Sequence, residues 1–192
     1  MEFKTDTEGK LGYFRPRSHE HVPAVECVLA RPELQKVAAR IPGLSGFPSV
    51  ELRSDGESVV LHAKSARRKR GQGRRRSPSS PPRKLLQSSL RSLFPEEELV
   101  GYFGLQGVAL DGKRVSGDVK LQLQSGGIQH QISPSSFYQV NLEVNELLVD
   151  RVRTLLMQRP IDTILDLYAG AGNLSFPLAA AGKRVTQIEV AG

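Results

Sequence analysis

The sequence predicts an α/β protein, in which a mixed and mostly antiparallel β-rich part precedes one βαβ unit with two parallel strands. Two observations favour this fold class. Up to about residue 132, short apolar segments with alternating polar residues are separated by Asp-Gly and Gly-Gly turns, as is typical of antiparallel strands. From residue 133 the apolar spacing becomes that of a helix, and a strand, a glycine turn, a helix and a second strand follow.

The composition limits the classes of protein to which the chain can belong. The chain has 192 residues, enough for one domain of ordinary size or two small ones. No apolar run is long enough to cross a membrane, and the first residues, MEFKTDTEGK, lack the apolar core of a secretory signal. The one cysteine, Cys27, excludes an internal disulfide and fits a reducing compartment. We therefore expect a cytoplasmic monomer without membrane association.

The first strands and the first helix follow from local patterns. Residues 11–30 contain two short apolar pieces that predict strands, and a helix is expected over residues 32–40. The stretch SVELRSDGESVVLHAK (49–64) predicts a hairpin, because apolar residues alternate with polar ones on both sides of Asp55-Gly56.

The residue pattern typical of strands returns over residues 98–133, after a short amphipathic piece, LLQSSLRSLF. Asp111-Gly112 and Gly126-Gly127 mark two turns in this region. The pattern predicts a meander of three antiparallel strands.

A basic segment, SARRKRGQGRRRSPSSPPRK (65–84), interrupts the first part. Nine basic residues and no acidic one lie between Arg67 and Lys84, whereas the rest of the chain holds 18 basic and 20 acidic residues. Without apolar periodicity, the segment is expected to be a disordered loop or linker. Three roles remain open: an arm that binds RNA phosphates, a basic localisation signal, or a solvated loop. The candidate RNA-binding residues are Arg67, Arg68, Lys69, Arg70, Arg74, Arg75 and Arg76.

A long helix is predicted after Ser133, within SPSSFYQVNLEVNELLVDRVRTLLMQ. Ser135 or Ser136 is expected to cap its start. Its apolar residues recur at helical spacing and predict one buried face, formed by Val144, Leu147, Leu148, Val152, Leu155 and Leu156.

The βαβ unit follows Pro160. IDTILDLY predicts a strand, NLSFPLAAAG predicts a helix that ends at Gly182, and KRVTQIEV predicts a second strand. Two strands joined through a helix in this way are expected to be parallel, with a right-handed crossover.

The turn between this strand and this helix, in ILDLYAGAGN (164–173), is a candidate ligand site, because ligands bind at the carboxyl ends of parallel strands. Gly170 and Gly172 let a ligand approach the backbone, and the carboxylate of Glu189 can accept hydrogen bonds from ribose hydroxyls. Ser175 stands where a dinucleotide fingerprint has its third glycine, which favours S-adenosylmethionine over NAD or FAD. A purely structural turn stays open.

Several segments together resemble the RNA uracil-5-methyltransferases. ISPSSFYQVN (132–141) is similar to their F-x-I-x-P-x-S-F-F-Q-V-N stretch, and ILDLYAGAGNLSFPLA (164–179) is similar to their V-L-D-L-F-C-G-x-G-N-F-T-L-P-L-A motif. VTQIEV resembles the strand that follows. The resemblance implies a central β-rich domain over 1–132, with the basic insert at 65–84. It also implies a linking helix and a partial Rossmann-like methyltransferase sheet over 133–192, which would be the first βαβ unit of that sheet.

The resemblance implies S-adenosylmethionine as cofactor and a uracil of tRNA or 23S rRNA as substrate. By motif position, Gln139 would contact the cofactor, Tyr168 would pack on it, and Gly170 would let it approach the loop. Asn173 would hydrogen-bond it, and Glu189 would hold its ribose.

Each of these residues has a plainer alternative. Gln139 could be a polar residue at a helix start, and Tyr168 could be a core aromatic. Asn173 could cap the helix, and Glu189 could be a solvated strand end. Asp166 is expected either to order the glycine turn through backbone N–H groups or to touch the ligand.

The family's nucleophile is a cysteine on a later strand, so the resemblance places no catalytic residue in this chain. The position of Cys27 resembles the last of four iron–sulfur ligands in many members, but one cysteine cannot hold a cluster. A cluster is therefore expected only in a full-length parent, and Cys27 is expected to be a small buried residue. We expect a fragment that binds cofactor weakly and does not methylate. A non-catalytic RNA-binding remnant that uses the basic insert is the alternative.

Overall fold

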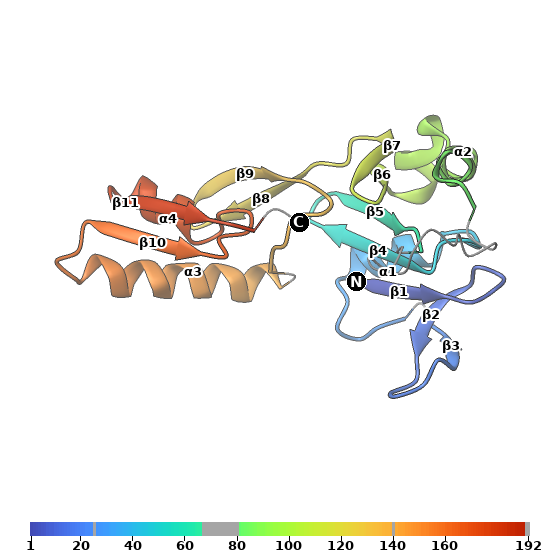
Figure 1. Cartoon of the computed structure of the whole chain (residues 1–192), viewed down its shortest axis with the longest axis horizontal. Coiled ribbons are helices and arrows are strands. Elements are labelled where there is room, and N and C mark those ends of the chain that lie inside the picture. The colour runs from blue at the N-terminus through green and yellow to red at the C-terminus, as the bar shows by residue number, and fades with distance from the viewer. Residues whose placement is uncertain (25, 67–80, 140, 191–192) are drawn as a thin grey trace, which may run out of the picture. The chain divides into compact units, whose positions relative to one another are not determined.

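The computed structural model describes residues 1–24, 26–66, 81–139 and 141–190 (Figure 1). The chain forms two compact units, Met1–Val119 (unit 1) and Lys120–Gly192 (unit 2). This division lies earlier than the predicted boundary after residue 132, because the hairpin over 121–132 makes hydrogen bonds with Glu146 and Asn173 later in the chain.

Unit 1 contains a seven-stranded sheet in the order β3-β2-β1-β4-β5-β6-β7 among its described residues. Every neighbouring pair is antiparallel except β5 and β6, which are parallel. The mixed, mostly antiparallel first part is thus confirmed. The strands are β1 (Glu2–Thr5), β2 (Leu11–Phe14), β3 (His21–Pro23), β4 (Ser49–Ser54), β5 (Val59–Lys64), β6 (Gly107–Leu110) and β7 (Lys113–Gly117).

The predicted hairpin is formed by β4 and β5, with Leu52 opposite Leu61. The carboxylate of Asp55 closes the turn by accepting from the backbone N–H of Ser58 at 2.8 Å. Gly56 has a φ of 105°, which is accessible to glycine and strained for other residues. The Asp-Gly pair therefore fixes the register that buries both leucines.

The predicted three-stranded meander over 98–133 is wrong. Residues 96–103 form η1 (Glu96–Glu98), a 3₁₀ turn, and η2 (Leu99–Phe103), a π-helix. The strands that follow belong to two separate hairpins, β6–β7 in unit 1 and β8–β9 in unit 2. Both predicted turns are correct, since Gly112 and Gly126 each have positive φ. The turns were recognisable from the sequence, but which strands share a sheet depends on distant partners.

The core of unit 1 lies between the sheet and helices α1 (Pro32–Ala38) and α2 (Arg83–Leu93). Phe3 of β1 and Phe94 after α2 are fully buried in it. α1 packs against β4 and β5, and α2 packs against β7. The connection from β5 to the parallel strand β6 includes α2. The predicted disordered segment over 65–84 is wrong at its end, because Arg83 and Lys84 form the first turn of α2.

Unit 2 contains the hairpin of β8 (Leu121–Ser125) and β9 (Ile128–Ile132), and the helix α3 (Leu142–Met157). Its βαβ segment runs from β10 (Thr163–Leu167) through α4 (Ser175–Ala180) to β11 (Arg184–Ile188). β10 and β11 are parallel, as predicted. Gly182 follows α4 with a φ of 89°, as expected for a glycine that ends a helix.

The predicted burial of α3 is wrong in detail. Of the six apolar residues assigned to its buried face, Leu147 remains 71% exposed and Val144 57% exposed. The helix instead buries Asn145 and Val149, because α3 packs against β8 and α4 along that face. The predicted serine cap is also wrong. Asn141 caps the helix, its side-chain oxygen accepting from the Val144 N–H at 3.0 Å.

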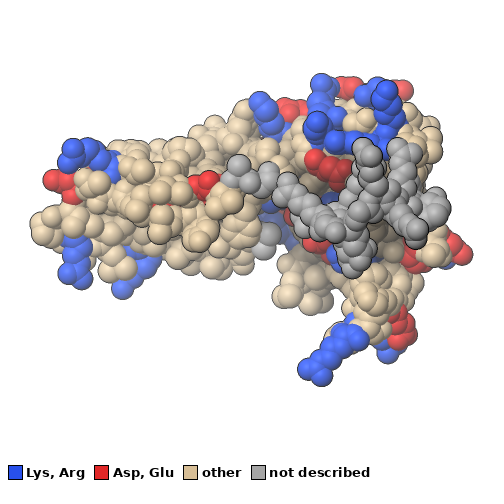
Figure 2. Space-filling model, viewed as in Figure 1, with Lys and Arg blue, Asp and Glu red and all other residues tan. Residues whose placement is uncertain are grey.

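Charge is unevenly distributed on the surface. Figure 2 shows that the visible face of unit 2 carries few charged side chains. In unit 1, exposed basic residues occur on α2 and β7, namely Arg83, Lys84, Arg91, Lys113 and Arg114. No helix among the described residues is long and apolar enough to span a membrane.

Candidate functional site

The glycine loop of unit 2 (residues 168–173) leaves β10 at the carboxyl edge of the parallel strand pair. Asp166 of β10 lies opposite Gln187 of β11, so the two strands end together. Beyond the strand end, the N–H groups of Tyr168 and Ala169 both donate to the carbonyl of Ile188, at 2.8 and 3.2 Å. These two bonds hold the first residues of the loop against the second strand.

Tyr168 begins the loop in an unusual conformation. Its φ is 61°, in the left-handed region that residues with a side chain seldom adopt. Its side chain is 80% exposed, so the alternative of a core aromatic is wrong for the described structure. Strained residues of this kind cluster at functional sites. The loop thus presents an aromatic ring to solvent at the edge where ligands of parallel sheets bind.

Gly170 and Gly172 make the rest of the loop possible. Both have positive φ, 57° and 81°. A Cβ at Gly172 would lie 2.5 Å from the ring of Phe176 and 2.8 Å from the amide nitrogen of Gln187. A Cβ at Gly170 would lie 3.5 Å from the carbonyl oxygen of Phe137, so the segment before α3 passes beside the loop. Gly172 is required by packing, whereas Gly170 keeps the loop backbone open.

Glu189 follows β11 and closes onto the loop. Its carboxylate oxygen Oε2 accepts from the backbone N–H of Gly170 at 2.7 Å. Two candidates that are 19 residues apart in the sequence therefore meet at the strand ends. This arrangement places an exposed carboxylate beside Tyr168 and Gly170, where it can accept hydrogen bonds from hydroxyl groups of a ligand.

Asp166 has a side-chain partner instead of the backbone N–H groups that were one of its two predicted roles, and the other role, contact with the ligand, stays a prediction. Its carboxylate accepts a hydrogen bond from the hydroxyl of Ser175, the buried first residue of α4. The described bond is thus to a side chain and not to the backbone of the turn. It ties the end of β10 to the start of α4.

Asn173 takes part in a buried hydrogen-bond network. Its side-chain oxygen accepts from Nδ2 of Asn145 at 2.8 Å and from the hydroxyl of Ser125 at 2.8 Å. Its Nδ2 donates to Oδ1 of Asn145 at 2.7 Å. The alternative that Asn173 caps α4 through its side chain is not observed, since the N-cap position of α4 is Leu174.

Gln139 lies in the irregular segment that precedes α3, and its side chain is exposed. Its neighbour Tyr138 is 4% exposed and anchors this segment. The carbonyl of Phe137 in the same segment is the one that passes beside Gly170. The structure thus brings Gln139's segment to the loop, while Gln139 itself is not part of a helix start.

Three functional candidates were missed from the sequence: Ser125, Asn145 and Glu146. Asn145 is 2% exposed and Ser125 is fully buried. Oε2 of Glu146 accepts from the N–H of Gly126 at 3.0 Å, which fixes the β8–β9 turn on α3. The sequence carried no signal for Asn145, because helical periodicity assigned the buried face of this helix to other residues. Its partners could not be read from the sequence.

His130 of β9 also lies beside the loop region of unit 2. Its ring packs edge-on against Phe176 of α4, with centroids 5.2 Å apart. Burial lowers the pKa of His130 below its usual value. The ring is therefore a neutral packing element at neutral pH.

Cys27 lies after β3 in unit 1 and is only partly buried, which corrects the prediction of a buried residue. Its carbonyl accepts a hydrogen bond from the side chain of Gln35 at 3.0 Å. No group of three or more His, Cys, Asp or Glu residues in the described part of the chain could hold a metal ion. A single cysteine does not fit an iron–sulfur cluster.

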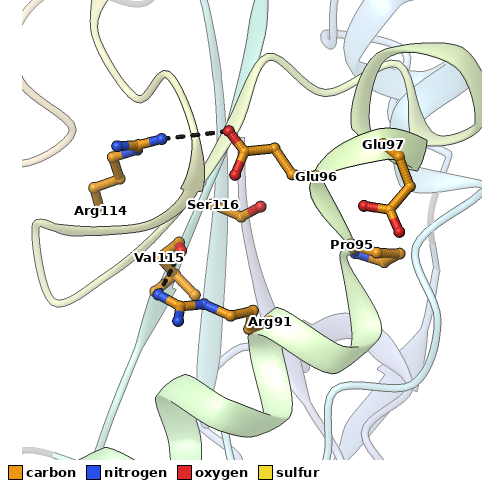
Figure 3. Close-up of a pocket in the computed structure, with 7 residues that line it drawn as sticks. All are labelled: Arg91, Pro95, Glu96, Glu97, Arg114, Val115 and Ser116. Atoms are coloured by element: carbon orange, nitrogen blue, oxygen red, sulfur yellow. Dashed lines mark hydrogen bonds and ion pairs between the residues drawn. The ribbon is translucent and has the colours of Figure 1, made fainter.

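The predicted RNA-binding residues from Arg67 to Arg76 lie outside the described residues. Beside α2, Figure 3 shows an open pocket lined by Arg91, Pro95, Glu96, Glu97, Arg114, Val115 and Ser116. Arg114 pairs with Glu96 at 3.3 Å, and Arg91 donates to the Val115 carbonyl at 3.2 Å. Because acidic and basic side chains both line the pocket, it has no clear preference for anions.

Comparison with known proteins identifies the family of the chain. A family model described as tRNA (uracil-5-)-methyltransferase matches residues 84–192, more than half of the chain. A 23S rRNA (uracil(1939)-C(5))-methyltransferase of Enterobacter sp. strain 638 is 32% identical over 170 residues, which cover 88% of this chain and 35% of the relative. The protein of that name from Dichelobacter nodosus is 29% identical over 185 residues, 93% of this chain and 39% of the relative.

A solved structure has the same fold. The tRNA (uracil-54, C5)-methyltransferase of Pyrococcus abyssi, in complex with S-adenosyl-L-homocysteine, gives a TM-score of 0.65 at 16% identity. The match covers 98% of this chain and 48% of that protein, so the chain spans less than half the length of these relatives. The chain belongs to the tRNA (uracil-5-)-methyltransferase family.

Proposed function

We propose that unit 2 carries part of the S-adenosylmethionine site of an RNA uracil-5-methyltransferase, on the first βαβ unit of a Rossmann-like sheet. The observation that carries this proposal is the meeting of Tyr168, Gly170 and Glu189 at the carboxyl ends of two parallel strands. In sheets of this kind, nucleoside ligands bind at those ends, and an acidic residue there accepts from the ribose hydroxyls.

The residues present fit this cofactor. Glu189 offers a carboxylate to the ribose, and the exposed ring of Tyr168 offers an apolar face to the base or the thioether. The loop has no basic residue, which suits a ligand without phosphates. Gln139 would contribute from the segment beside Gly170. When bound, the cofactor supplies the methyl group that goes to C5 of the uracil.

The described geometry also favours a limited role for Asn173. Its oxygen already accepts two hydrogen bonds and one of its two N–H groups is used, so one side-chain donor remains for a cofactor. We propose that Asn173 contributes through this donor or through its backbone.

Methyl transfer to C5 of a uracil needs a thiolate that adds to C6. Cys27 belongs to unit 1, and no thiol is present in unit 2. We therefore propose that residues 1–192 alone bind the cofactor weakly and do not methylate. The whole protein would act on rRNA or tRNA, as a monomer in the cytoplasm.

Titration with S-adenosylhomocysteine tests this function. We expect a Kd of roughly 0.1 to 1 mM, which corresponds to about 4 to 5.5 kcal/mol. In amide NMR spectra, the signals of Gly170 and Glu189 should move. Glu189→Gln should weaken binding about tenfold, because a neutral amide accepts more weakly from hydroxyl groups than a carboxylate does.

Asp150→Asn is the matched control, since Asp150 on α3 contacts only Arg153 among its described ion pairs, at 3.0 Å. This variant should bind like the parent chain. If NADH shifts the amide signals of Gly170 and Glu189 as much as S-adenosylhomocysteine does, the assignment to S-adenosylmethionine is overturned. If neither ligand shifts them, the cofactor site is overturned.

A second candidate function is a non-catalytic RNA-binding module. The observation that favours it is the concentration of nine basic residues, with no acidic one, between Arg67 and Lys84. Such a segment supports sequence-tolerant phosphate binding with a steep dependence on salt. This function does not require unit 2 to bind a cofactor.

A further inference from the structure

The glycine loop is held in place by residues that do not belong to it. Asn173, at the end of the loop, exchanges two hydrogen bonds with Asn145 of α3, at 2.8 and 2.7 Å. Ser125, the last residue of β8, donates to the same side-chain oxygen of Asn173 at 2.8 Å. Three segments of unit 2 therefore meet at one amide group.

Two of the three residues in the network are buried, whereas Asn173 is partly exposed. Asn145 is 2% exposed and Ser125 is fully buried, so neither can exchange these bonds for water without local opening. A buried amide that loses its hydrogen-bond partner still pays the free-energy cost of leaving water. The arrangement in which Asn145 and Asn173 are bonded to each other is therefore strongly preferred. The side chain of Asn173 is thereby fixed in one orientation, and the backbone of the loop is fixed with it.

The hairpin that supplies Ser125 is itself locked onto α3. Gly126 donates its N–H to Oε2 of Glu146 at 3.0 Å, next to Asn145 in the helix. A Cβ at Gly126 would lie 2.8 Å from Pro177 of α4 and 2.9 Å from Val149 of α3. The turn therefore sits tightly against both helices, and Ser125 has little freedom to move away from Asn173.

We propose that Asn145 and Ser125 are positioning residues for the cofactor. They act through Asn173 to hold residues 168–173 in the conformation in which Tyr168, Gly170 and Glu189 meet. The inference rests on the proposed cofactor site, but it adds two residues that lie outside the glycine motif. It also assigns a role to the β8–β9 hairpin, which would set the loop without touching the ligand.

The test measures two properties of the 192-residue chain: exchange of the Gly170 and Gly172 amide protons, and affinity for S-adenosylhomocysteine. In Asn145→Ala we expect faster exchange at both glycines and about tenfold weaker binding. Ser125→Ala removes the bonds from its hydroxyl to the side-chain oxygen and the backbone carbonyl of Asn173, at 2.8 and 3.1 Å, and leaves the amide pair, so about threefold weaker binding is expected. It also serves as the milder variant if Asn145→Ala does not fold.

Asn141→Ala is the matched control. Asn141 lies one turn earlier on the same helix and caps it through a bond of 3.0 Å to the Val144 N–H. This variant should lower helix stability without changing exchange at Gly170 or the affinity. If it changes both as much as Asn145→Ala does, the effect is general destabilisation and the positioning role is overturned.

Asn145→Asp gives a readout that a merely structural role would not produce. The new carboxylate still accepts from Nδ2 of Asn173 but cannot donate to its oxygen, so the loop is released at neutral pH. Protonation restores a donor, so the protection of both amides relative to their intrinsic exchange rates, and the affinity, should recover as the pH falls, whereas those of the parent chain should not rise. No recovery at low pH would contradict the inference.

Failure of the inference and failure of the proposed function are distinguishable. If the parent chain binds the ligand and all three network variants bind equally well, the positioning role is overturned and the cofactor site stands. If the parent chain does not bind, the cofactor site is overturned, and exchange at Gly170 still decides whether the network holds the loop.

Discussion

Tyr168 shows how a single residue can indicate a site. A tyrosine with a φ of 61° costs roughly 1 to 2 kcal/mol relative to an ordinary conformation. Its ring recovers none of this cost by burial, because the side chain is 80% exposed. The strain is held by the two bonds from residues 168 and 169 to the Ile188 carbonyl. We therefore interpret the conformation as one that serves a ligand rather than the core.

Replacing Tyr168 separates strain from function. In Tyr168→Gly, the free energy of unfolding should stay equal or rise by about 0.5 to 1 kcal/mol, because relief of strain exceeds the entropy that glycine adds to the unfolded chain. The affinity for S-adenosylhomocysteine should fall. Tyr168→Ala is the control that keeps the strain and removes the ring, so it should lose affinity without gaining stability. Denaturant unfolding and ligand titration measure the two effects. Destabilisation by the glycine would contradict this account.

His62 on β5 makes the stability of unit 1 depend on pH. Burial is the largest cause that lowers the pKa of His62, and Glu51 partly opposes it. Its Nε2 accepts from the N–H of Gly112 at 2.8 Å, which requires an unprotonated nitrogen. Because the folded pKa lies below the ordinary value of 6.5, the unfolded chain takes up more protons at lower pH. The stability from this residue is thus present above pH 6.5 and is lost as the pH falls.

His62→Gln should remove this dependence, since its amide oxygen can still accept from Gly112 and does not titrate. The parent chain should lose unfolding free energy between pH 7 and 5 more steeply than the variant in urea titrations. His130→Gln is the comparison in unit 2, because burial also lowers the pKa of His130. A parent chain and His62→Gln variant with parallel pH profiles would show that His62 does not carry the effect.

At the scale of elements, local chemistry predicted more than packing did. Asp55-Gly56 predicted the β4–β5 hairpin, and the order of strand, turn, helix and strand predicted the parallel pair β10–β11. Both signals are contained in a few adjacent residues. The meander failed because the assignment of β6–β7 and β8–β9 to different sheets depends on residues far away in the sequence.

The same limit applies to α3 and to the site. Helical periodicity located the helix but not the face that packs, because β8 and α4 select the face with Asn145 and Val149. The glycine loop was predicted from its motif, and Glu189 from its distance along the chain. The partners of Asn173 could not be predicted, because they come from a hairpin and a helix that have no pattern in common.

The exposed apolar face of α3 is testable. Leu147 is 71% exposed and Leu155 is 43% exposed, so replacing both by Gln should change the free energy of unfolding by about 0.5 kcal/mol or less. The variant should also bind less of a hydrophobic dye and self-associate less in size-exclusion chromatography. Val149→Ala is the contrasting change. Val149 is 2% exposed, and its truncation should cost roughly 1 to 2.5 kcal/mol.

At the scale of the whole molecule, the chain combines a strongly basic segment with two folded units. Removing the segment between Arg67 and Lys84 from the count leaves 18 basic and 20 acidic residues, so the positive charge of the chain comes from that segment. Unit 2 carries few charges on the face seen in Figure 2. Any binding of RNA phosphates that depends on salt should therefore depend on this segment.

Replacing the seven basic residues of 67–76 by Ser tests this expectation and leaves Arg83, whose side chain donates to the Leu110 carbonyl at 3.1 Å, in place. Binding to single-stranded RNA should weaken at low salt, and the slope of log K against log salt should fall by about 0.7 for each phosphate that the variant no longer neutralises. A control with the residues of 67–76 in scrambled order should bind like the parent chain, because interactions with phosphates carry no base preference. An unchanged affinity in the serine variant would leave the segment as a solvated loop, and the protein would then have to bind RNA through its folded units.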